Sequence, residues 1–174
     1  MPSVNWTAAE STLHDLSRDQ LTRFLVGPVR EQIYAVGFFF DPASGDVFPT
    51  ANSVDQHLKT YRQQIADHGP TDEQLLLWDT GLWAYPVGLF PDNDAEFQAF
   101  DRLWDKHREA IAASDDPALP VQFRRMCVEV LRRLYRGGTF ASTPNLIGYT
   151  VQSPDDLPED LPGLKEQVTK VVTA

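Results

Sequence analysis

The chain has 174 residues, of which 42% are hydrophobic and 23% are charged, and its formal net charge is -10. This length and composition predict a single globular domain built around one core. The acidic balance disfavours nucleic acid and anionic lipid as partners, because both repel a negative surface, and a macromolecular partner is expected to be basic.

Cys127 is the only cysteine, which excludes an internal disulfide and a cysteine-rich zinc site and fits a reducing, cytoplasmic location. The first ten residues lack the cationic start and the apolar stretch of a signal peptide. No apolar run is long enough to span a membrane. The histidines are scattered rather than clustered, so we expect neither a metal site nor a cofactor. They are His14, His57, His68 and His107.

The first predicted helix covers 8–26, where apolar residues recur at helical spacing until Gly27 and Pro28 end the pattern. The apolar run Ile33–Phe40 comes next, and its lack of alternation predicts a central strand that is covered on both faces.

The turn residues Asp41–Asp46 and a second apolar segment at 46–51 complete the pattern of a β-hairpin. Pro49 has no N–H to donate to a neighbouring strand. We therefore expect the second strand to be short or to lie at an edge of the sheet.

The rest of the chain contains both helical and strand patterns. The sequence predicts helices from Ser53 to Gly69, from Asp92 or Asn93 to Ser114, and over 120–136. Because strands and helices do not alternate strictly, the predicted fold is α+β, with a small antiparallel or mixed sheet and four to five helices in one domain over 1–174. The expected strands lie near 33–40, 46–51, 75–78 and 145–152. Residues 153–174 are expected to form a loosely packed acidic tail that contains prolines.

An aromatic loop is the first candidate for a binding site. Asp79 lies among Trp78, Trp83 and Tyr85, a composition that suits a pocket with one polar anchor. The alternative is that these rings cap the core. We expect Trp78 in the core and Trp83 or Tyr85 partly exposed beside a shallow pocket.

An arginine-rich helix is the second candidate, because Arg125, Arg132 and Arg136 fall along one side of the segment 120–136. Such a stripe either pairs with carboxylates or presents its guanidinium groups to an anion. Cys127 lies on the apolar stripe of the same helix, where burial makes a nucleophilic role improbable.

No residue can be recognised as catalytic from the sequence pattern. His57 is expected on a solvated helix face, and His107 lies on an apolar stripe typical of a core histidine. The carboxylates show no acid and base pair, because such pairs are recognised by environment and geometry. An enzymatic role is therefore disfavoured.

Several of these segments resemble a mostly bacterial family known as domain of unknown function 4303. The resemblance covers most of the chain and rests on motifs of structural character. They are the strand Tyr34–Phe40, the segment Phe48–Ser53 before a helix, Trp78 and Trp83 with the following Tyr85, and a late strand near Leu146–Val151. The family has no established activity, so the resemblance implies a fold more than a function.

Families of this size and style recur among immunity proteins of bacterial toxin systems. The resemblance and the acidic charge together favour a non-enzymatic binding protein that neutralises a basic toxin. One alternative is a small enzyme or a small-molecule-binding protein with a pocket near the loop from Trp78 to Tyr85, and another is an architectural domain of a larger assembly. The sequence names neither the partner nor the oligomeric state.

Overall fold

The computed structural model describes residues 4–27, 32–70, 79–86, 94–143, 146 and 148–151. They form an α+β fold, as the sequence predicts. In chain order the elements are α1 (Trp6–Leu25), β1 (Ile33–Asp41), β2 (Asp46–Ser53), α2 (Val54–His68), the short 3-10 helix η2 (Thr80–Leu82), β3 (Tyr85–Pro86), α4 (Asp94–Ala112), α5 (Leu119–Arg136) and β4 (Gly148–Val151).

The four described strands form one mixed sheet in the order β3-β2-β1-β4. β1 pairs antiparallel with β2 and parallel with β4, and β2 pairs antiparallel with β3. The short strand Tyr85–Pro86 lies where the sequence predicts a loop. The strand expected at 75–78 and the tail expected at 153–174 lie outside the described residues.

The expectation that β1 is central and covered is confirmed. It lies between β2 and β4, and all of its residues are buried except the half-buried Phe39 and Asp41. Phe40 contacts Phe123 of α5, with ring centroids 5.0 Å apart, whereas Phe39 lies near Gly81 of η2 and stacks on its cross-strand neighbour Phe48 at 5.0 Å. Successive side chains point to opposite faces of a strand, so β1 has packing partners on both faces.

The expected effect of Pro49 on β2 is wrong. β2 is eight residues long and is an interior strand among the four. The reason is the shortness of β3, which pairs only with Thr50 and Ala51. Pro49 itself therefore faces no partner in β3, and its missing N–H removes no bond on that side.

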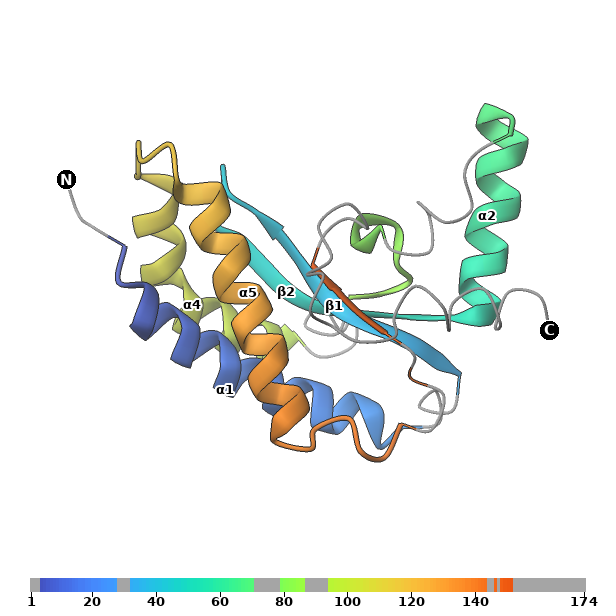
Figure 1. The fold of residues 1–174 in the computed structure, drawn as a ribbon, viewed down its shortest axis with the longest axis horizontal. Coiled ribbons are helices and arrows are strands. Elements are labelled where there is room, and N and C mark those ends of the chain that lie inside the picture. Colours follow the sequence, from blue (N-terminus) through green and yellow to red (C-terminus); the bar gives the residue numbers. More distant parts are fainter. Residues whose placement is uncertain are drawn as a thin grey trace.

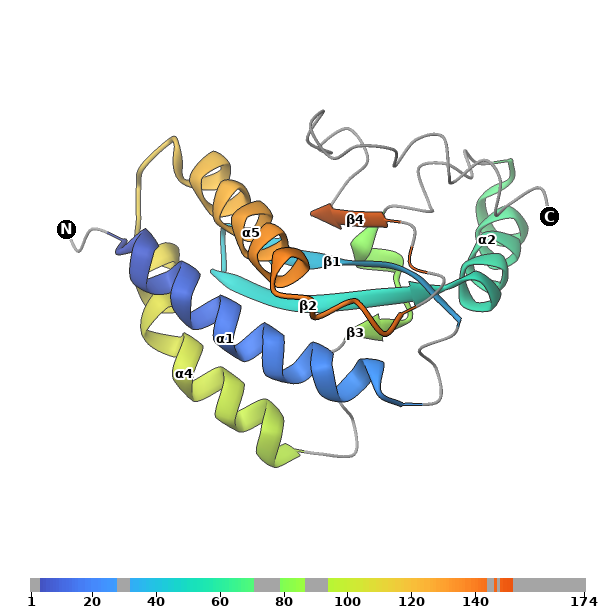
Figure 2. The same cartoon turned by 60° about the horizontal axis from the view of Figure 1, so that its bottom comes forward.

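Three helices, α1, α4 and α5, are grouped on one side of the sheet, whereas α2 stands at its far end (Figures 1 and 2). Helix α1 contacts both α4 and α5, and α5 also contacts β1 and β4. Helix α1 begins two residues earlier than predicted, because the side chain of Asn5 accepts a hydrogen bond from the N–H of Ala8 at 3.1 Å and caps it.

The turn between β1 and β2 is locked against α4. The indole Nε1 of Trp104 donates a 2.9 Å hydrogen bond to the carbonyl of Gly45. Gly45 has a φ of +77°, and an added Cβ would lie 2.6 Å from the carbonyl oxygen of Arg108. Only glycine satisfies both the backbone conformation and this close approach.

Two further predictions about the core are confirmed. His107 is 5% exposed, and its Nε2 lies 3.1 Å from Oγ1 of Thr12, which joins α4 to α1. Burial, together with the nearby charge of Lys106, lowers the pKa of His107. Cys127 is fully buried, and burial raises the pKa of its thiol, which opposes a nucleophilic role.

Candidate functional site

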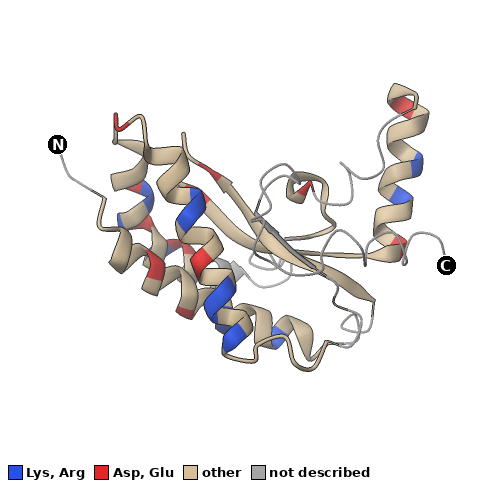
Figure 3. Cartoon of the chain, viewed as in Figure 1, with Lys and Arg blue, Asp and Glu red and all other residues tan. Residues whose placement is uncertain are grey.

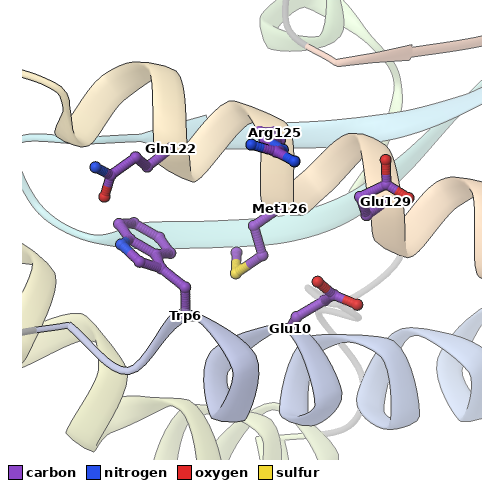
Figure 4. A pocket seen from close by; sticks show the side chains of 6 residues that line it. All are labelled: Trp6, Glu10, Gln122, Arg125, Met126 and Glu129. Atoms are coloured by element: carbon purple, nitrogen blue, oxygen red, sulfur yellow. The ribbon is translucent and has the colours of Figure 1, made fainter.

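A groove lies between α1 and α5, where the first turn of α1 runs beside the middle of α5 (Figure 4). Its volume is about 270 Å³. That is slightly below the range of roughly 300 to 1,000 Å³ typical of ligand pockets, so the groove suits one or two side chains better than a large cofactor. Its lining residues are Trp6, Glu10, Gln122, Arg125, Met126 and Glu129.

The floor of the groove is apolar. Met126 is 4% exposed and belongs to the core, and the half-buried Trp6 packs on Phe123 with ring centroids 6.0 Å apart. An indole face beside a flexible thioether is a surface that adapts to different apolar groups. The core beneath supports this floor, because Phe123 is itself fully buried.

The charged groups around the groove are not equally paired. Glu10 accepts a 3.1 Å hydrogen bond from Arg133, and Glu129 accepts one from Arg132. Arg125 is exposed and makes no ion pair within the part of the chain that the structure describes. The carboxylates of Glu10 and Glu129 are therefore each paired with an arginine other than Arg125. The positive charge of Arg125 is not paired with a carboxylate of the described residues.

The arginine stripe thus divides into residues with different surroundings. The structure places Arg125, Arg132 and Arg136 on α5, as predicted, but only Arg125 lines the groove. Arg132 pairs with a neighbour one turn away, and Arg136 lies in the last turn of the helix. A cation in the last turn also stabilises the negative end of the helix dipole.

The aromatic loop is not brought to this groove. Trp83 is 6% exposed and packs edge-on against Tyr34 at 6.4 Å, whereas Tyr85 is half-buried, so Tyr85 is the partly exposed ring of the two. The Oδ1 of Asp79 accepts a 2.9 Å hydrogen bond from the N–H of Gly81 and caps η2. Trp78 lies outside the described residues.

Sequence reasoning misses a buried polar cluster next to Trp83. His57 is 2% exposed and lies between the rings of Tyr34 and Tyr61, each with its centroid 6.2 Å away, so its predicted solvated position is wrong. The hydroxyl of Tyr34 accepts a 3.3 Å hydrogen bond from Asn52. Burial raises the pKa of Tyr34, which keeps its hydroxyl protonated. A bulge at this end of β1 accompanies the cluster.

A second charged surface lies on α1 and α4, which pack side by side (Figure 2). Arg18 bridges Asp15 at 3.7 Å and Asp19 at 3.2 Å. The guanidinium of Arg108 contacts three carboxylates at once. These are Asp46 at 2.8 Å, Asp105 at 2.7 Å and Asp101. Each of these two arginines is outnumbered by the carboxylates around it.

Two further features, a metal site and a membrane-spanning helix, have no candidate among the described residues. They contain no group of three histidine, cysteine, aspartate or glutamate side chains placed to hold a metal ion. None of the helices in the described ranges is long and apolar enough to cross a membrane.

Comparison with known proteins gives no match to a family model, to a curated protein or to a solved structure. The resemblance to domain of unknown function 4303 therefore stays a prediction.

Proposed function

We propose that this chain is a non-enzymatic binding protein whose partner is a basic protein, and that it serves as an immunity protein that neutralises a basic toxin in a bacterial toxin system. The observation that carries the proposal is the excess of carboxylates on the surface of α1 and α4.

This excess remains after the basic residues of the two helices are counted. Helices α1 and α4 together contain eight aspartate and glutamate residues and five arginine and lysine residues, Arg23 included. The two helices therefore have a formal charge of -3 in a chain of -10. Asp15 and Asp19 are 65% and 60% exposed, so a partner reaches both without any rearrangement.

Exposed ion pairs of this kind contribute little to folding, typically about 0 to 1 kcal/mol. Their carboxylates are therefore free to exchange an internal arginine for a lysine or arginine of a partner at small cost. A complementary potential also speeds the encounter of two proteins, and salt suppresses this effect because the Debye length is about 8 Å at physiological ionic strength.

A pocket for a small molecule at the aromatic loop is not the function we propose. In the described part of that loop, the carboxylate of Asp79, the expected polar anchor for a ligand, instead caps η2 by accepting a hydrogen bond from the N–H of Gly81. The ring of Trp83 is packed against Tyr34.

The experiment pairs the chain with the basic toxin encoded beside its gene. We expect co-expression to relieve growth arrest by the toxin, and we expect the association rate of the purified proteins to fall between about 50 mM and about 300 mM salt. The double variant Asp15→Asn/Asp19→Asn should associate about three- to tenfold more slowly than the wild type.

The matched control is Asp55→Asn/Asp67→Asn, which removes the same charge from exposed positions of α2 at the far end of the sheet (Figure 1). It should associate nearly as fast as the wild type. Three results contradict the proposal: no basic toxin gene beside this one, an association rate that ignores salt, or equal slowing by the two double variants.

A further inference from the structure

The charge of this protein is sharply segregated. Helix α5 carries five arginines and one glutamate, a formal charge of +4 in a chain of -10, so the residues outside α5 sum to -14. Figure 3 shows basic residues spread along the length of α5. A basic helix in so acidic a protein is a local feature that the net charge conceals.

Folding accounts for most of these arginines. Arg132 and Arg133 pair with Glu129 and Glu10, and the helix dipole favours Arg133 and Arg136 in the last turn. Arg125 has neither role, because it lies in the middle of the helix and makes no ion pair among the described residues.

The surroundings of Arg125 are apolar as well as positive. It lines the groove beside Met126 and Trp6, and one turn earlier Val121 is 71% exposed on the same helix. A complementary ligand therefore carries a carboxylate for the guanidinium and an apolar group for the floor, because Arg binds carboxylates through two parallel hydrogen bonds.

We propose that the groove between α1 and α5 binds a short acidic segment of a partner protein, with a carboxylate on Arg125 and an aromatic or aliphatic side chain on Trp6 and Met126. The volume of about 270 Å³ fits one such side chain. The -14 outside α5 repels a long polyanion such as nucleic acid, but a segment a few residues long stays within the field of α5. This inference uses a different surface from the proposed function and does not rest on it.

The test measures fluorescence anisotropy with a labelled peptide in which glutamates flank one phenylalanine. We expect Arg125→Gln to weaken binding about tenfold, as the loss of a central charged anchor does, and Arg125→Lys to weaken it less. The control Arg62→Gln removes the same charge from an exposed position of α2 and should bind like the wild type. Thermal melts of each variant establish that it is folded.

Two altered peptides separate the carboxylate from the apolar anchor. Replacing the phenylalanine by alanine, or the glutamates by glutamine, should each reduce the affinity at least about fivefold, because the groove takes both groups. Equal binding of the phenylalanine and alanine peptides would mean that binding depends on general charge attraction, and it overturns the proposal.

No binding of the phenylalanine peptide at about 1 mM overturns the proposal too, since that concentration detects even weak contacts. Binding that appears only after residues 152–174 are removed shows that the acidic end of the chain itself occupies the groove, and it overturns a partner segment.

Discussion

The interior beneath α1 and α5 and the interior around Trp83 are built from different side chains. Beneath the helices most of the buried residues are aliphatic or aromatic, among them Val36, Phe38 and Phe123. Most of the buried polar side chains belong instead to β2, α2 and η2, where Tyr34 contacts Trp83, His57 and Asn52. They are Thr50, Asn52, Ser53, His57 and Thr80. Apolar burial stabilises the first interior, whereas the second depends on hydrogen bonds that must be made.

This difference shows which of the two interiors defines the geometry of the fold more narrowly. An apolar interior tolerates small rearrangements, because dispersion and burial have no preferred direction. A polar interior fixes its geometry, because each donor left without a partner costs free energy. In that interior the Oγ1 of Thr80 is buried and has no hydrogen-bond partner among the described residues.

The largest effect should come from a charge in the apolar interior. Val36→Asp places a carboxylate at a position that is 0% exposed in the central strand. Several kcal/mol are lost when a charge is buried without a partner, against a total stability of about 5 to 15 kcal/mol. We expect no cooperative thermal transition by circular dichroism.

Val121→Asp is the matched control, because Val121 is 71% exposed. It should stay within about 0.5 kcal/mol of the wild type, as surface changes usually do. A cooperative melt of Val36→Asp near the wild-type temperature would show that β1 is not covered on both faces.

A cavity in the polar interior should have the next largest effect. Trp83→Ala removes a ring that is 6% exposed and packs against Tyr34, so we expect the free energy of unfolding to fall by about 3 to 5 kcal/mol. Urea unfolding measures this. Asp79→Asn in the same loop should cost less than about 0.5 kcal/mol, because an asparagine oxygen caps a helix as well as an aspartate does. Similar losses in both variants would contradict the assignment of Trp83 to the core.

A smaller effect should come from one hydrogen bond in the polar interior. Tyr34→Phe removes the hydroxyl that accepts from Asn52 and leaves that amide without this partner. The free energy of unfolding should fall by about 1 to 2 kcal/mol. A double-mutant cycle with Asn52→Ala should show a coupling of about 0.5 kcal/mol or more, and additive losses would mean that the bond contributes nothing.

The same contrast explains what the sequence predicts well. The central strand, the helix over 120–136 and the burial of Cys127 and His107 all follow from apolar periodicity, which reports burial directly. The stripe of Arg125, Arg132 and Arg136 follows from helical spacing in the same way. Periodicity fails where a buried polar residue does not lie on a clear apolar stripe.

His57 shows this failure. His57 is polar on a helix whose other face is solvated, so its burial depends on the ring of Tyr34, which β1 supplies from another part of the chain. Which of Trp83 and Tyr85 is buried depends in the same way on a distant contact, that of Trp83 with Tyr34. The groove escapes sequence analysis as well, because it joins Trp6 to Arg125 across more than a hundred residues and no local pattern links them. Contacts between distant segments are set by packing, which one sequence does not display.

The smallest effect should come from acid, and it tests a polar group inside the apolar interior. His107 is buried against Trp104 and Thr12, and burial, with the charge of Lys106, lowers its pKa from the usual 6.5. The unfolded chain therefore binds a proton at a higher pH than the native chain does. The contribution of the neutral ring is fully present above about pH 6.5 and is lost as the pH falls toward the native pKa.

Urea unfolding at about pH 7.5 and about pH 5.5 should show lower stability in acid, and His107→Gln should reduce this dependence by removing the titrating group. His68→Gln, at an exposed position of α2, serves as the control and should keep the wild-type dependence. An unchanged dependence in His107→Gln would show that other groups titrate in this range and that burial of this ring does not set the response to acid.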